Sequence, residues 1–235
     1  MSFIIAIQVR EGFVMASDSR ITFTSTESPA NGQQVVKLGT HISDTTYKTF
    51  LTPSNVGIST CGDASLNDQP LTGYIESYIE THQHETIDEI KDSIRSYFRN
   101  LKQDLNTTFL IAGYIKDNDN YLPRCYKVNI AADSVIDYST APAVWDGEVD
   151  VMSRLTTTVY YKKQDGNFNE FPKREILWQY FTLQDAIDFA RYAVQVTIDT
   201  MRFRKTVKTV GGPVDILVIR PRSDGGKWIS RKELK

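Results

Sequence analysis

The first twenty residues, MSFIIAIQVREGFVMASDSR, constrain the fold of this chain more than any other stretch. Phe3–Val9 and Phe13–Asp18 are runs rich in apolar and β-branched residues, and the short turn Arg10-Glu11-Gly12 separates them. Two such runs joined by a turn that contains glycine predict a β-hairpin. The chain therefore begins with a buried strand, which Ser2 directly precedes.

The rest of the chain alternates between strand-like and helix-like segments. Runs rich in β-branched residues predict further strands at Gln33–Leu38, Thr46–Leu51, Asn55–Thr60, Thr107–Ile115, Tyr121–Val128, Val214–Arg220 and 227–230. Apolar residues at helical spacing predict three helices, which begin near Pro70, at the capping box Thr86-x-x-Glu89 and near Thr182. This order predicts a single α+β domain over residues 1–235, with sheets stacked on each other and helices outside. Residues 156–180 show no clear period, and we expect an insertion or a lid there.

The composition excludes several classes of function. The chain has 235 residues, with 27 lysines and arginines against 29 acidic residues, and this balance removes the electrostatic case for a nucleic-acid partner. Cys61 and Cys125 make no disulfide framework, and no Cys/His cluster suggests a metal, so we expect neither metal nor cofactor. The sequence shows no signal peptide and no apolar run that could span a membrane. These features predict a cytoplasmic protein without a membrane partner.

Ser2 gains chemical interest if Met1 is removed, which is routine ahead of a small residue. The mature chain would then begin with a free α-amine and a hydroxyl on adjacent carbons. A serine hydroxyl needs a base within hydrogen-bonding reach before it acts as a nucleophile at neutral pH. The α-amine has an ordinary pKa of about 8, and a neighbouring lysine would lower that pKa and favour the basic form. An aspartate behind the lysine would keep it oriented and protonated.

Asp18 and Lys48 are the candidates for these two groups. Asp18 falls within a residue or two of pairing with Ser2, and their even separation predicts side chains on one face of the hairpin. Lys48 lies in the run Thr46–Leu51, although Lys37 in the preceding run is an alternative for the same role. Backbone N–H groups in the Cys61–Gly62 turn, where a strand gives way to a helix, are candidates for an oxyanion hole.

Each of these residues also has an ordinary structural explanation. Serine is common at position 2 because it permits methionine removal, and Asp18-Ser19-Arg20 is typical of a turn with a solvated salt bridge. A lone lysine such as Lys48 is ordinarily the exposed residue of a half-buried strand. The side chain of Cys61 is expected to be a small buried hydrophobe. The joint presence of all four features favours a site, with Ser17 and Arg20 as structural supports.

Four stretches in chain order carry a family resemblance: Ala16-Ser17-Asp18-Ser19-Arg20, Lys48-Thr49-Phe50, Gly57–Ala64 and Val210-Gly211-Gly212-Pro213. Together they resemble the proteasome β-subunit superfamily of N-terminal-nucleophile hydrolases, which includes the bacterial protease HslV. Asp199-Thr200-Met201-Arg202 and Gly147-Glu148 resemble the bacterial branch called Anbu. The chain departs from the superfamily in having serine rather than threonine as its first mature residue. It also has Ala143–Gly147 where a glycine-serine turn is usual.

The resemblance implies a fold, a reaction and a set of residues. The fold would be a four-layer αββα sandwich, and the reaction would be peptide hydrolysis through an acyl-ester on Ser2. Lys48 would be the catalytic lysine, the Cys61 backbone N–H would stabilise the oxyanion, and Asp199 would be a candidate for a supporting aspartate. The partners would be a peptide or protein substrate, further copies in a ring or helical stack, and an ATPase unfoldase. The alternatives are an inactive structural subunit of the same fold and an amidase that acts on a small molecule.

Overall fold

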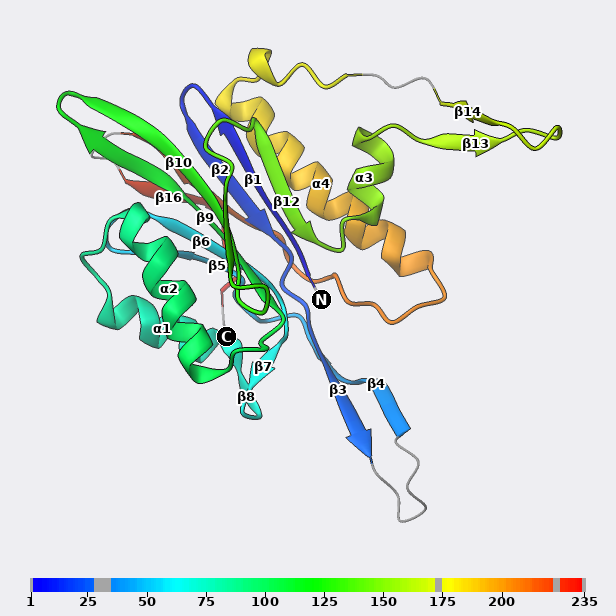
Figure 1. The fold of residues 1–235 in the computed structure, drawn as a ribbon, viewed down its shortest axis with the longest axis horizontal. Coiled ribbons are helices and arrows are strands. Elements are labelled where there is room, and N and C mark those ends of the chain that lie inside the picture. The colour runs from blue at the N-terminus through cyan, green and yellow to red at the C-terminus, as the bar shows by residue number, and fades with distance from the viewer. Residues whose placement is uncertain (1, 28–34, 172–174, 222–224, 234–235) are drawn as a thin grey trace.

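Two five-stranded antiparallel sheets form the centre of the protein (Figure 1). The structure, a computed structural model, describes residues 2–27, 35–171, 175–221 and 225–233, and the side chains of all of these except 24–27 and 35–40. The first sheet has the strand order β12 (Ala143–Gly147), β1 (Phe3–Val9), β2 (Gly12–Ser17), β15 (Asp215–Ile219) and β16 (Gly226–Ser230). The second has the order β11 (Ser134–Asp137), β10 (Asn120–Asn129), β9 (Thr107–Asp117), β6 (Gly57–Gly62) and β5 (Thr49–Leu51).

The predicted N-terminal hairpin is confirmed, and it lies in the middle of the first sheet. β1 and β2 pair in antiparallel register, with Ile4 opposite Ser17 and Val9 opposite Gly12. Every residue of β2 is buried, as is nearly every residue of β1. A strand that is covered on both faces needs an almost continuous apolar run, which the sequence of this hairpin provides.

Three clusters of buried side chains show what covers each face of the sheets. One cluster lies between the two sheets and includes Ile4 and Met15 from the first and Leu110 from the second. A second joins the other face of the first sheet to α3 (Asp150–Thr156) and α4 (Leu183–Phe203). The third joins the other face of the second sheet to α1 (Leu71–Thr81) and α2 (Ile87–Leu101). Both sheets are therefore buried on two sides, and the protein is of mixed α+β class.

The helix starts follow the local signals in the sequence. α2 begins after Thr86 and α4 begins after Thr182, and both helices have the predicted capping box. In each box the threonine side chain accepts the N–H of a residue three positions later, whose own carboxylate accepts the threonine N–H. Within the described residues, no helix has the length and apolar character that crossing a membrane requires.

Two hairpins project from this body (Figure 1). β3 (Ile21–Glu27) and β4 (Val35–Ser43) form one, so the strand expected at Gln33–Leu38 is longer, and its first two residues lie outside the described ranges. β13 (Tyr160–Lys162) and β14 (Phe168–Glu170) form the other, which extends from the side of the protein that carries α3. This second hairpin and the short helix η1 (Trp178–Tyr180) occupy the segment expected to be an insertion or a lid. The short strands β7 (Ser65–Leu66) and β8 (Gln69–Pro70) lead into α1.

Candidate active site

Ser2 lies at the start of β1 and is almost completely buried, with 6% of its surface exposed. Its carbonyl oxygen accepts a hydrogen bond of 2.8 Å from the N–H of Glu148, which follows β12. Gly147 pairs with Phe3 and has a φ of +95°, and a Cβ atom at Gly147 would lie 1.9 Å from the Ser2 carbonyl oxygen. The unusual Ala143–Gly147 stretch is therefore the strand that holds Ser2, and only glycine fits at its end.

The register of the hairpin corrects one expectation about Asp18. The Asp18 N–H donates to the Phe3 carbonyl at 3.3 Å, so Asp18 lies opposite Phe3, within one residue of Ser2 as predicted. In an antiparallel pair, residues that lie opposite each other share a face, and neighbours along a strand do not. Ser2 would thus share a face with Ser19, and the even separation from Asp18 was the wrong criterion. Asp18 still lies next to Ser2, because it comes just after the end of β2 and its carboxylate accepts the N–H of the Ser2–Phe3 peptide bond.

The Asp18 carboxylate is fully buried and accepts four hydrogen bonds. Oδ1 accepts the Phe3 N–H at 3.1 Å and the Lys48 ammonium at 2.8 Å. Oδ2 accepts the N–H groups of Arg20 at 3.1 Å and Gly211 at 3.0 Å. An ionised carboxylate acts only as an acceptor, and these four donors use nearly all of its capacity. Asp18 thus ties together β1, the turn after β2, the segment before β15 and Lys48.

Lys48 reaches Asp18 from the second sheet. It lies just before β5 rather than inside a strand, and its carbonyl accepts the Thr60 N–H of β6 at 2.8 Å. Only 5% of the residue is exposed, so the expectation of an ordinary exposed lysine is wrong. Burial lowers the pKa of the Lys48 ammonium, and the neighbouring Asp18 carboxylate opposes that change. In the described part of the chain the ammonium donates to Asp18 alone, and Lys48 lines the pocket beside Ser2, where its other N–H groups could meet a substrate or water.

The Cys61–Gly62 turn forms another side of the same pocket. Gly62 has a φ of +115°, and a Cβ atom there would lie 2.1 Å from the Asn106 carbonyl oxygen, so the turn requires glycine. Successive N–H groups of a central strand point to opposite sides. Since the Thr60 N–H points toward Lys48, the Gly62 N–H points to that side too, and the Cys61 N–H points toward β9. Burial raises the pKa of the Cys61 thiol to about 12, as befits the buried hydrophobe that its sequence predicted.

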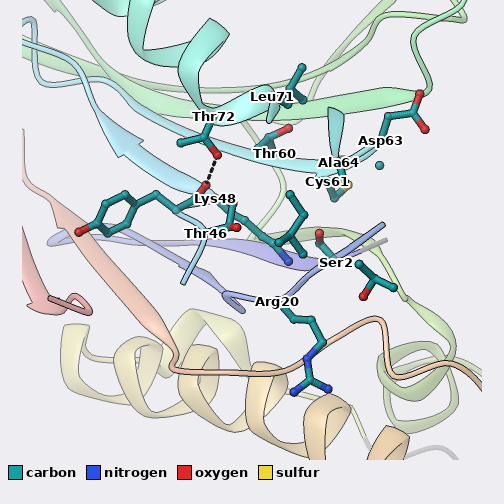
Figure 2. Close-up of a pocket in the computed structure, with 14 residues that line it drawn as sticks. Ser2, Arg20, Thr46, Lys48, Thr60, Cys61, Asp63, Ala64, Leu71 and Thr72 are labelled. Atoms are coloured by element: carbon teal, nitrogen blue, oxygen red, sulfur yellow. Dashed lines mark hydrogen bonds between the residues drawn. The ribbon is translucent and has the colours of Figure 1, made fainter. Parts of the chain in front are cut away.

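A narrow pocket with a volume of about 30 Å³ joins these groups. This is room for about two water molecules, since one needs roughly 10–15 Å³. Figure 2 shows Ser2, Lys48 and Cys61 close together in the pocket. The Oγ1 atoms of Thr22 and Thr60, which also line the pocket, are buried and have no hydrogen-bond partner in the described residues. The remaining walls are Arg20, Ile21, Thr46, Tyr47, Gly62, Asp63, Ala64, Leu71 and Thr72.

The two predicted supports lie beneath and beside the pocket. Ser17 Oγ accepts a 2.8 Å hydrogen bond from Thr49 Oγ1, which also lies 2.9 Å from Ser59 Oγ, so hydroxyl groups link the two sheets. The Arg20 guanidinium points away from the pocket (Figure 2) and holds Asp44 at 2.6 and 2.7 Å. This contact keeps the pKa of the Asp44 carboxyl below its usual range.

Two candidates are not brought to the pocket. Asp199 is exposed on α4, where it accepts a hydrogen bond from Gln195 one turn away. Lys37 lies in the projecting hairpin, where its backbone pairs with Ser25, and its side chain is outside the described set. The sequence also gave no sign of the Gly211 N–H or of the Thr209 hydroxyl, which donates to Glu148 at 2.8 Å. Both come from a segment nearly 200 residues away from Asp18, and only the resemblance of that segment to a family motif pointed to it.

Comparisons with known proteins agree with this geometry at the level of the fold. No protein-family model and no curated protein matches the sequence. Anbu (ancestral beta-subunit) from Yersinia bercovieri matches the structure with a TM-score of 0.60 and 17% identity, over 98% of this chain and 88% of that one. Anbu from Hyphomicrobium sp. strain MC1 matches with a TM-score of 0.59 and 16% identity, over 98% and 88%. A Gly-1 mutant of it matches with a TM-score of 0.58 and 14% identity, over 99% and 89%. Over nearly its whole length, this chain therefore has the fold of Anbu, the ancestral beta-subunit.

Proposed function

We propose that the chain is an N-terminal serine hydrolase, most suited to peptide bonds, whose nucleophile is Ser2 after Met1 is removed. The observation that carries this proposal is the buried Asp18–Lys48 pair, whose ammonium faces the pocket that Ser2 lines. Burying two charges costs several kcal/mol each, so such a pair is weak evidence for stability. The position of Lys48 in the lining of the pocket beside Ser2 supports a chemical role for this pair. The three clusters of buried side chains support a four-layer αββα arrangement, with helices outside two stacked sheets.

In the proposed mechanism, the free α-amine of Ser2 is the base that accepts the proton of its own hydroxyl, through a water in the pocket. The Lys48 ammonium lowers the pKa of that amine, and Asp18 holds Lys48 in place. The hydroxyl oxygen attacks the amide carbon, and the resulting oxyanion is stabilised at the Cys61–Gly62 turn by the Gly62 N–H, which points to the Lys48 side, rather than by the Cys61 N–H that the resemblance implied. The amine then protonates the leaving nitrogen, and water hydrolyses the acyl-ester to restore Ser2.

The surface around Ser2 supports an extended substrate. A larger depression of about 420 Å³ shares Thr22, Gly62, Asp63 and Ala64 with the narrow pocket, and Lys102 and Val207 also line it. A peptide could lie along it and place one small side chain in the narrow pocket. We also propose that the chain works as a cytoplasmic homo-oligomer, a ring or a helical stack, since soluble proteins of this size commonly assemble symmetrically. A partner ATPase that unfolds proteins belongs to the same proposal.

The narrow pocket favours one alternative within the same reaction class. A pocket of about 30 Å³ admits a small group, as an amidase for a small acyl-amino compound would need. Peptides and small acyl-amides with the same group next to the amide separate the two alternatives. A peptidase gains in kcat/KM as residues are added on either side, whereas a small-molecule amidase gains nothing.

The direct test is the intact mass of the purified protein before and after treatment with a β-lactone or a peptide epoxyketone. We expect a mass without Met1 that increases by one probe, and no increase for Ser2→Ala. Ser77→Ala, at an exposed position on α1, is the matched control and should be labelled like the wild type. A chain that keeps Met1 and takes no probe would identify an inactive structural subunit instead.

A further inference from the structure

The segment after β16 places one buried side chain next to residues that adjoin the candidate site. Lys232 has 5% of its side chain exposed and forms an ion pair with the fully buried Asp215 of β15. The Lys232 N–H also donates to Asp215 Oδ1 at 2.8 Å, so the same carboxylate binds the backbone and the side chain of one residue. This is the second buried lysine–aspartate pair of the protein, and the mechanism proposed above does not use it.

On one side, Lys232 holds the residue that follows Asp18. Its ammonium donates to Ser19 Oγ at 2.9 Å, and that hydroxyl donates to the Pro213 carbonyl at 2.6 Å. The Ser19 N–H donates to the Gly211 carbonyl at 2.9 Å, while the Gly211 N–H donates to Asp18. Ser19 and Gly211 thus help to fix the position of the Asp18 carboxylate, and Lys232 binds the Ser19 side chain.

On the other side, Lys232 holds the residue that precedes Lys48. The Tyr47 hydroxyl donates to the Lys232 carbonyl at 3.2 Å. The Lys232 ammonium lies 4.4 Å from the centroid of the Tyr47 ring, and the Arg231 guanidinium lies 4.6 Å from it. Cations at such distances from an aromatic face attract it, more strongly when water is excluded. One residue therefore contacts the immediate neighbours of both Asp18 and Lys48.

We propose that Lys232 is a positioning residue, through which the C-terminal segment fixes the Asp18–Lys48 pair at the distance that activates Ser2. The inference rests on the proposed function, because it concerns the activation of that same serine. Lys232 does not line the pocket and acts through Ser19 and Tyr47. A displacement of about 1 Å at a reacting centre costs on the order of 10²-fold in rate, so a support of this kind affects catalysis without touching substrate.

The test compares two pairs of substitutions in the full chain. Lys232→Met with Asp215→Asn removes both charges, so that no buried carboxylate is left unpaired. Arg99→Met with Asp133→Asn removes an ion pair of 3.2 Å between α2 and the β10–β11 turn, and serves as the matched control. For each protein, the rate constant of acylation by the β-lactone and the probe concentration at half-saturation are measured separately. Amide exchange of the Arg20 and Gly211 N–H groups, the two donors to Asp18 Oδ2, is followed by NMR.

If Lys232 positions the pair, its double variant acylates at least about tenfold more slowly with the same half-saturating concentration. Amide exchange at Arg20 and Gly211 becomes faster in that variant. The Arg99→Met/Asp133→Asn control changes neither the acylation rate constant nor the amide exchange. Lys232→Arg, which keeps the cation, acylates faster than the double variant. Unchanged acylation and exchange, or an equal loss in the control, would overturn the inference. A wild-type protein that takes no probe would refute the proposed function instead. The exchange rates would then still decide whether Lys232 holds the donors to Asp18.

Discussion

Two buried lysine–aspartate pairs, Asp18–Lys48 and Asp215–Lys232, differ in their other hydrogen bonds. In the first pair most of these bonds are made by the aspartate, and in the second they are made by the lysine. Asp18 accepts three backbone N–H groups in addition to Lys48, whereas the Lys48 ammonium donates to Asp18 alone among described residues. Among the described residues, the Asp215 carboxylate accepts one backbone N–H, and that N–H belongs to Lys232 itself. The Lys232 ammonium donates to Asp215 and to Ser19 and rests on the Tyr47 ring.

The consequence is that the Lys48 ammonium is available to a group in the pocket, whereas the Lys232 ammonium is occupied by the protein itself. In the first pair, the protein saturates the carboxylate and leaves ammonium donors at a pocket with room for water. In the second pair, the protein supplies partners for the Lys232 ammonium, and 5% of the Lys232 side chain and none of the Asp215 side chain is exposed. Geometry of the first kind is what a catalytic lysine needs, because its charge must act on a group that arrives in the pocket.

We expect the largest effect when the lysine of each pair is replaced, one at a time, by methionine. Lys48→Met should lower the acylation rate on the order of 10²-fold or more, because the α-amine of Ser2 loses the cation that lowers its pKa. Lys232→Met should slow acylation less, by about tenfold, because it acts through Ser19 and Tyr47. It should cost more in stability, about 3–5 kcal/mol, because among the described residues one backbone N–H would then remain for the buried charge of Asp215. Acylation kinetics and urea unfolding, measured on both variants, check the two halves of this prediction.

The contrast fails if the two variants are alike. Lys48→Met should lose less stability than Lys232→Met, since three backbone N–H groups still stabilise the Asp18 carboxylate. A Lys48→Met protein that acylates at the wild-type rate would remove the lysine from the mechanism. Arg95→Met, which removes a half-exposed residue with partners at 3.6 Å, is the matched control and should change neither quantity appreciably.

The next effect concerns the contact that holds Ser2 beside the first pair. Gly147→Ala would place a Cβ atom 1.9 Å from the Ser2 carbonyl oxygen, at a φ of +95°. We expect acylation to fall on the order of 10²-fold as Ser2 is displaced, with a loss of stability of about 1–3 kcal/mol from the strained backbone. Gly166→Ala, in the β13–β14 turn, has a φ of +89° and no atom within 4 Å, so it isolates the backbone strain. Equal acylation by both alanine variants would contradict the prediction.

The sequence predicted those parts of the molecule that local signals determine. In each capping box, at Thr86 and at Thr182, the two residues involved are only three positions apart. The N-terminal hairpin needs only one turn, so all of these features were found. Asp18 was placed within one residue of its partner, yet the face was wrong, because the parity of a hairpin depends on the turn and not on the separation alone. The run predicted at Thr46–Leu51 is a strand over Thr49–Leu51 alone, so Lys48 lies just before β5 rather than inside it.

The rest of the site depends on contacts that no local pattern encodes. Lys232 bonds to Ser19 across 213 positions, and Gly211 bonds to Asp18 across 193. Lys232 stands in a charged tail that is typical of a solvated surface, and only the folded sheet shows that it is buried. Asp199 failed for the opposite reason, because a match in sequence order placed it near a motif while the helix directs it to solvent.

A smaller effect should appear in what the pocket beside the first pair accepts. Thr60 Oγ1 is buried and unpartnered in the described residues, so a polar group of the substrate could satisfy it. Thr60→Val keeps the shape of the side chain and removes the hydroxyl. We expect the preference for a peptide epoxyketone ending in serine over one ending in alanine to fall about 2- to 10-fold, the worth of one hydrogen bond. Thr107→Val removes another unpartnered hydroxyl that does not line the pocket, and it should leave the preference unchanged.

The smallest effect tests whether the cation of the first pair activates every nucleophile near it. Cys61 lies in the same pocket as Lys48, yet burial raises the pKa of its thiol to about 12 from an ordinary value of about 9. The folded protein holds this proton more tightly than the unfolded chain, so the thiol stabilises the fold fully below pH 9 and ever less as the pH rises toward 12. At pH 8 iodoacetamide should therefore leave Cys61 unmodified in the native protein and modify it in urea, as read by mass spectrometry. Rapid native labelling of Cys61 would mean that Lys48 outweighs burial, and Cys61 would then compete with Ser2 for electrophilic probes.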